Sequence, residues 1–197
     1  MEIRRVKKHD VDMTSGSVFR HLLNFAVPLL MGNIFQQLYN TVDTWVVGNY
    51  VSNEAFSAVG TVAPIINTLI GAFSGLASGA GGDISQYYGA GKYDRVKDAV
   101  HTAVMMTLVL SVVFTAIGIA MTPNMLRLMK TPAEVFPESR AYLNIYFSGM
   151  AGLMLYNMGA GILRAVGDSN RPFYYLVCAA VIDTVLDLVL VIAFGMG

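Results

Sequence analysis

Charged side chains are scarce in this 197-residue sequence, where 13% of residues are charged and 55% are hydrophobic. Soluble domains carry about 25% charged residues, so the composition excludes an ordinary soluble domain. The deficit is concentrated in five long segments, of which only the last contains charges, Asp183 and Asp187: His21–Val42, Ala55–Gly82, Ala99–Leu126, Ala141–Leu163 and Pro172–Phe194. Each suffices for the ~20 mainly apolar residues that cross a bilayer. We therefore predict an all-α integral membrane protein with five transmembrane helices.

Other features are also missing. The single cysteine, Cys178, excludes an internal disulfide. No short apolar region near the N-terminus precedes a small-residue cleavage site, so we expect the first span to be retained. There is no phosphate loop, metal-ligand spacing, paired nucleophile and base, or basic patch with interleaved aromatic residues. We therefore expect neither an enzyme, nor a bound cofactor, nor a nucleic-acid partner.

The charged segments between the spans divide the chain. Residues 1–16 form a polar, mixed-charge segment, and residues 17–197 form the transmembrane bundle. We expect its helices at about residues 18–47, 54–81, 100–121, 138–164 and 172–194, with a proline-containing connector at 122–137. Gly71, Gly75 and Gly79 recur at four-residue spacing, which favours close helix packing on that face.

The distribution of Lys and Arg predicts the orientation. With alternating crossings, ten of the thirteen lie on the side of the N-terminus, the 89–98 loop and the 164–171 loop, and three lie on the other side. Cytoplasmic loops carry the excess of positive charge. We therefore expect a cytosolic N-terminus and a multi-pass protein in the bacterial cytoplasmic (inner) membrane, with the lipid bilayer as a partner.

The first span carries an unusual polar stripe. At about 100° per residue, Asn33, Gln36, Asn40 and Asp43 fall within roughly 80° on one face of a helix. An ionisable group at bilayer depth costs at least about 2.5–3.5 kcal/mol, which a protein cavity or a bound cation can offset. We assign Asn33, Gln36, Asn40 and Tyr39 to a substrate cavity.

Two further carboxylates lie in the fifth span. Asp183 and Asp187 are four residues apart and therefore share one face of the helix. Neighbouring carboxylates in low dielectric either share a proton or hold a cation between them. With Asp43, they are expected in the outer half of the membrane and form a candidate cation site for sodium or a proton. The alternative is that each is solvated at the outer mouth.

Asn157 lies midway along the fourth span. A buried Asn needs hydrogen-bond partners. Position alone leaves two roles open, a place in the polar cavity and cation site or a hydrogen bond between helices.

Four stretches together carry a resemblance to a known family. They are PLLMGNIFQQLYNTVDTWVVG, SQYYGAGKYDRVKDAVHTA, YNMGAGILRAVGDSNRP and AAVIDTVLDLVLVIAFG, and they span nearly the whole chain. The sequence resembles the N-terminal lobe of MATE (multidrug and toxic compound extrusion) transporters, in their bacterial DinF-like branch. The resemblance implies twelve helices in two six-helix lobes around a central cavity. It also implies export of drugs or organic cations by antiport against sodium or protons.

The resemblance also assigns roles to residues. Asp43 matches the first-helix carboxylate of the N-lobe cation site, Gln36 a cavity glutamine, and Pro28 a proline linked to bending of the first helix. Asn157 matches a cavity asparagine of the fourth helix, and Asp187 matches the fifth-helix carboxylate.

The sequence departs from the family pattern in two positions and in length. Asp183 stands where Asn is usual, and Ala160 stands where a second polar residue is expected. The five spans stop before the sixth helix of the lobe, so we expect a fragment of a chain about twice as long, with the missing C-lobe as its partner.

Two other functions remain as alternatives. A flippase-like carrier of a lipid-linked substrate needs basic residues in its cavity for a phosphate head group. The five charge-poor segments contain no Lys or Arg, which disfavours such a carrier. The second alternative is a non-transporting truncated membrane remnant.

Overall fold

The computed structural model describes residues 17–50 and 52–193. The described chain is helical throughout: α1 (Val18–Tyr50), α2 (Asn53–Gly89), α3 (Tyr93–Leu128), α4 (Phe136–Ser148), α5 (Met150–Ala165) and α6 (Asn170–Asp187), which continues as a π-helical stretch, η1 (Leu188–Ala193). The predicted N-terminal segment 1–16 and residues 194–197 lie outside the described residues.

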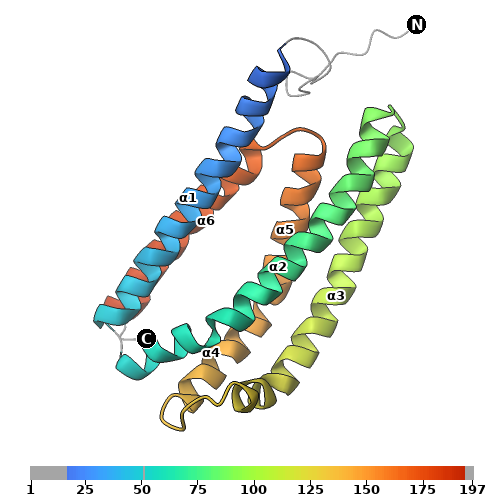
Figure 1. Cartoon of the computed structure of the whole chain (residues 1–197). Helices are drawn as coiled ribbons and strands as arrows, with labels where there is room; N and C mark the ends of the chain where they lie inside the picture. Colours follow the sequence, from blue (N-terminus) through green and yellow to red (C-terminus); the bar gives the residue numbers. More distant parts are fainter. Residues whose placement is uncertain (1–16, 51, 194–197) are drawn as a thin grey trace, which may run out of the picture.

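The helices form two groups (Figure 1). Helices α2, α3, α4 and α5 pack together, while α1 and α6 lie side by side along their lengths and run in the same direction. The start of α1, the α2–α3 turn and the α5–α6 turn lie at one end of the molecule. Most of the basic residues that the structure describes therefore lie in segments that share one end, as alternating crossings require.

Helices α2 and α3 extend well beyond the predicted spans. Asp94 occupies the first turn of α3, and Pro123 lies inside it, so the connector to α4 is shorter than predicted. A charge-free run marks the part of a helix that crosses lipid. It does not mark where the helix ends, because charged residues continue the helix into water.

The predicted fourth span is two helices, α4 and α5, that meet at Gly149. The backbone N–H of Gly149 donates hydrogen bonds to the carbonyl oxygens of both Ile145 and Tyr146. The ψ angle of Gly149 is near zero (φ −84°, ψ −1°). In the described chain, three helices are long and apolar enough to cross a membrane: α2, α3 and α6 extended to Leu190. The polar stripe of α1 and the break at Gly149 explain why the other two predicted spans fall below that criterion.

The apolar core lies among α2, α3, α4 and α5. It consists of seven buried side chains, Val62, Phe73, Leu126, Leu143, Phe147, Met150 and Met154. Close backbone contact between α2 and α5 occurs at Gly161, where a Cβ would lie 3.0 Å from the carbonyl oxygen of Ala77. The predicted glycine packing face is not used in this way. A Cβ added at Gly71, Gly75 or Gly79 would meet no described atom within 4 Å.

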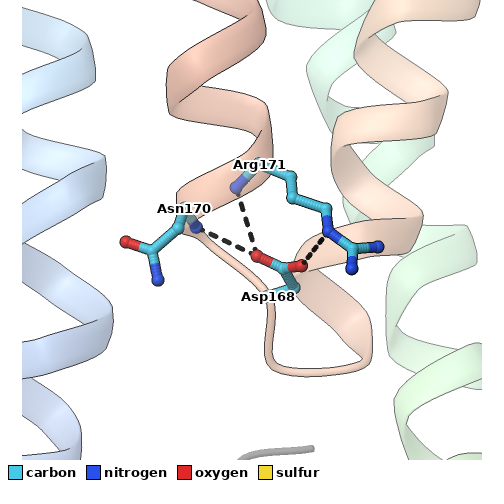
Figure 2. A network of polar contacts seen from close by, with 3 residues as sticks. All are labelled: Asp168, Asn170 and Arg171. Carbon is cyan, nitrogen blue, oxygen red and sulfur yellow. Dashed lines mark hydrogen bonds and ion pairs between the residues drawn. The ribbon is translucent and has the colours of Figure 1, made fainter. Parts of the chain in front are cut away.

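The turn between α5 and α6 is held by Asp168 (Figure 2). Its Oδ1 accepts hydrogen bonds from the backbone N–H groups of Asn170 and Arg171, at 3.2 and 3.1 Å. Its Oδ2 lies 3.0 Å from Nε of Arg171. The Tyr156 hydroxyl of α5 also donates to the carbonyl oxygen of Pro172, at 3.3 Å. These bonds fix the first turn of α6 relative to α5.

Filling the space at Gly118 should destabilise the protein. Gly118 of α3 is buried, and a Cβ there would overlap the ring of Phe147. Gly118→Val therefore forces the α3–α4 contact apart, at a cost of about 1–3 kcal/mol. Thermal unfolding of the detergent-purified protein should show a lower midpoint. Gly75→Val, which meets open space, is the matched control, and equal midpoints for the two variants would contradict this packing.

Removing the Asp168 carboxylate should weaken the α5–α6 turn. Asp168→Ala leaves two backbone donors of α6 without their acceptor, and loss of such a cap costs about 0.5–2 kcal/mol. Arg171→Gln removes only the exposed ion-pair partner, a contribution of about 0–1 kcal/mol. We expect the unfolding midpoint to fall further in Asp168→Ala than in Asp168→Asn or Arg171→Gln. A midpoint for Asp168→Ala no lower than that of Arg171→Gln would show that the cap contributes nothing.

Candidate functional site

A cavity of about 210 Å³ lies where α1, α2, α5 and the start of α6 meet. Other hollows of the bundle are larger, and we call this one the main cavity because it gathers predicted site residues from separate helices. Helix α1 contributes Pro28, Leu29, Gly32, Asn33 and Gln36, and α2 contributes Ile70 and Ser74. Helix α5 and the start of α6 complete the lining with Leu153, Tyr156, Asn157, Ala160, Arg164, Ser169, Pro172, Phe173 and Leu176.

The main cavity unites residues that the sequence placed on separate spans. Asn33 and Gln36 of α1 face the same space as Asn157 of α5, and Pro28 also lines it. Nδ2 of Asn157 donates to the carbonyl oxygen of Leu153 at 2.9 Å. An asparagine side chain has capacity for about four hydrogen bonds, so this one leaves capacity for a ligand. Asn157 thus lines the same cavity as Asn33 and Gln36, and its place in a cation site stays a prediction.

The rest of the polar stripe on α1 lies elsewhere. Asn40 lines a separate open groove with Thr44, Trp45 and Phe56. Tyr39 is half-buried and belongs to neither lining. The structure thus places Asn33 and Gln36 together in the main cavity, and Asn40 and Tyr39 outside it. The physical reason is that the start of α6 covers α1 near Gly32, while the part of α1 around Asn40 lies near the start of α2.

The predicted cation-site carboxylates lie beyond the main cavity along α1 and α6. Asp183 is half-buried and does not line the cavity. The side chains of Asp43 and Asp187 lie outside the described part of the structure. No group of three His, Cys, Asp or Glu residues suited to a metal ion occurs among the described side chains, a set that excludes these two. A shared carboxylate site therefore stays a prediction.

The helix register nevertheless gives the heights of these positions. A Cβ on Gly32 would lie 3.7 Å from both Phe173 and Leu176, so these parts of α1 and α6 are level. Asp43 follows Gly32 by the same number of residues as Asp187 follows Leu176. Because the two helices run in the same direction with equal rise, the backbones at Asp43 and Asp187 are expected at similar heights.

Sequence reasoning missed the charged residue of the main cavity. Arg164 was counted with the 164–171 loop, at the very end of the predicted helix 138–164. It lies in the last turn of α5, half-buried, and lines the cavity. Helical spacing could have found it. Asn157, Ala160 and Arg164 are three and four residues apart and therefore share one face. The charge-free run ended at Leu163, which concealed that the helical face continues.

A family model described as MatE matches residues 28–189. A protein named "Probable multidrug resistance protein YoeA", from Bacillus subtilis (strain 168), is 38% identical over 91% of this chain and 39% of its own length. "Probable multidrug resistance protein YpnP", from the same strain, is 31% identical over 94% of this chain and 42% of its own length. A protein named "FAD transporter", from Shewanella oneidensis, is 25% identical over 94% of this chain and 40% of its own length.

Solved structures agree with the sequence matches. A structure described as the outward-facing conformation of a multidrug resistance MATE family transporter of the MOP superfamily superposes with a TM-score of 0.89 and 25% identity, over 97% of this chain and 42% of that chain. A MOP superfamily transporter from Pyrococcus furiosus, described as having a binding pocket of reverse polarity, gives the same TM-score and coverage. The chain thus spans about two-fifths of the relatives that it matches, as one lobe of a two-lobe transporter would. The chain belongs to the MATE family of integral membrane transporters.

Proposed function

We propose that this chain forms the N-terminal lobe of a cation-coupled antiporter that exports drugs or organic cations across the bacterial cytoplasmic membrane. The observation that carries the proposal is the main cavity, which gathers Asn33, Gln36 and Asn157 among α1, α2, α5 and the start of α6. Neutral polar groups among apolar side chains suit varied small molecules. Relatives named as multidrug resistance proteins support this substrate class. Transport by antiport requires no enzymatic chemistry and no cofactor beyond the coupling ion.

The coupling ion, sodium or a proton, binds at the level of Asp43 and Asp187, with Asp183 one turn away and Asn157 as a neutral ligand. The parallel register of α1 and α6 supports this assignment. Adjacent carboxylates at bilayer depth repel each other unless a cation lies between them or a proton is shared. The third carboxylate, Asp183, adds negative charge and strengthens attraction for either ion.

Ion binding is transmitted to the cavity through α1. Pro28 lies inside α1, where it removes one backbone hydrogen bond, and it lines the main cavity. A cation taken up from outside shifts the equilibrium toward a form of α1 that bends or moves near Pro28. The movement displaces the substrate outward, and the ion leaves inward after the lobes reorient.

The remaining wall of the transport path comes from lipid and from a C-lobe. Helix α1 exposes a row of large apolar side chains, Leu30, Ile34, Leu38, Val42 and Trp45. In water such a surface would be unfavourable, but against lipid tails or a second lobe it is not. Relatives more than twice as long as this chain support the second lobe.

A carrier of anionic or lipid-linked substrates is the second candidate. The argument against it was that the spans contain no basic residue, and Arg164 in the main cavity removes that argument. The related protein named FAD transporter and the structural neighbour with a pocket of reverse polarity both support a broader range of substrates for this fold.

Neutralising Asp43 should abolish ion-coupled export. We would load vesicles containing the protein of the intact reading frame with ethidium and apply a sodium jump and, separately, a proton jump. Efflux should follow one ion and fall to the vesicle background in Asp43→Asn, because the neutral amide holds neither a proton nor a charge-paired cation. Dye fluorescence measures the efflux.

Glu54→Gln is the matched control. Glu54 is an exposed acidic residue in the first turn of α2, at the same end of the bundle as Asp43. The Glu54→Gln variant should retain coupled efflux. Coupled efflux that survives in Asp43→Asn would contradict the cation site. Absence of efflux under both gradients, with the protein shown to be in the membrane, would instead favour the lipid-linked carrier or a non-transporting remnant.

A further inference from the structure

The charge of the main cavity points away from an exclusive preference for cations. Of the described residues that line it, Arg164 is the only charged one, and the others are neutral polar or apolar. Neither Asp183 nor any other described carboxylate lines the cavity. The only charge that the described lining presents to a bound molecule is therefore one guanidinium group.

Arg164 also lines a second space. A groove of about 540 Å³, which we call the inner groove, lies between α1, α2 and the end of α5. It shares Leu29, Asn33, Ser74 and Arg164 with the main cavity, and it continues along α2 past Ser78 to Ser85. These positions lie toward the end of the bundle that carries most of the basic residues, the expected cytosolic end. Arg164 thus stands where the two spaces join.

The inner groove is rich in neutral hydrogen-bond donors. Ser74 and Ser78 are exposed on α2, and their hydroxyl groups can donate to an acceptor in the groove. Arg164 is again the only charged residue among the described lining residues. Hydroxyl donors beside a guanidinium group match the acceptor-only chemistry of a carboxylate or a phosphate.

The two arginines at the α5–α6 turn differ in their partners. Arg171 is paired with Asp168, whose carboxylate is also occupied by two backbone N–H groups (Figure 2). Arg164 is half-buried, and the described part of the chain gives it no ion pair. A partly buried charge without a partner is unfavourable, and an anion from outside the chain would offset that cost.

We propose that Arg164 binds the negatively charged group of a substrate, a carboxylate or a phosphate, at the junction of the main cavity and the inner groove. The planar guanidinium fork binds such groups through two parallel hydrogen bonds. This inference rests on the proposed transport function for its biological meaning, but binding itself can be measured without transport. It extends the substrate class from cations to anionic and zwitterionic compounds.

Equilibrium binding of two fluorescent probes tests the inference. Anisotropy of carboxyfluorescein, an anion, and of ethidium, a cation, would be measured on the detergent-purified protein of the intact reading frame. Arg164→Gln should weaken carboxyfluorescein binding by about tenfold, the loss expected for one charge-assisted pair, and leave ethidium binding unchanged. Arg164→Lys should restore part of the affinity, since it keeps the charge but loses the fork. Arg171→Gln is the control, because Arg171 is paired with Asp168 and does not line the cavity; this variant should bind both probes as the wild type does.

Several results would overturn the inference. The first is no carboxyfluorescein binding by the wild type. The second is unchanged carboxyfluorescein binding in Arg164→Gln, which would mean that the arginine extends to the interface. The third is equal loss of affinity for both probes, which would mean a purely structural role. A transport failure with Arg164-dependent binding would reject the antiporter and keep the anion site. Competition by a polyisoprenyl pyrophosphate but not by inorganic pyrophosphate would assign the anion to a lipid-linked compound, and competition by both would assign it to a soluble one.

Discussion

The close contact between α2 and α5 determines where the functional groups lie. At Gly161 a Cβ would come within 3.0 Å of the Ala77 carbonyl oxygen and 3.1 Å of the Ala77 Cβ, so the two backbones are nearly in contact. In lipid, where apolar burial drives little association, such small-residue contacts hold helices together. With this face of α5 fixed on α2, the adjacent face, which carries Asn157 and Arg164, is directed to the space beside α1 and α6.

The α1–α6 pair closes that space from the other side. Gly32 of α1 faces Phe173 and Leu176 of α6, both at ordinary van der Waals distance from where its Cβ would lie. The hydrogen bond from Tyr156 to Pro172 and the Asp168 cap hold the first turn of α6 against α5. A cavity results because the two groups of helices are tied near the α5–α6 turn, while α1 makes little contact with α2.

Much of the helical arrangement could be predicted from the sequence. Charge-free runs located the apolar segments, and the excess of Lys and Arg grouped the loops that lie at one end. What the runs could not give was the helix ends, because Asp94 and Arg127 extend α3 into water without interrupting it. The apolar runs also could not predict the break at Gly149. One continuous helix and two helices separated by a single residue have the same apolar composition.

The candidate site was predicted in part, for a reason that lies in helix geometry. Periodicity tells which residues share a face, and it correctly grouped Asn33 with Gln36. It does not tell which helix covers that face, so it could not separate Asn40, which lies in another groove. Likewise, Gly71, Gly75 and Gly79 share a face, but the packing on α5 uses the face with Ala77. Arg164 was missed because it was counted with the loop.

The positions of charge along α1 and α6 bear on how coupling would work. Gln36 lines the cavity, and Asp43 lies two turns further along α1, a rise of about 10 Å. Arg164, at the other end of the cavity, is further still from the carboxylates along the bundle axis. An ion near Asp43 and a substrate near Arg164 would therefore share no charged ligand. Coupling between them would have to pass through a change in α1 itself, whose Pro28 lies in the cavity wall.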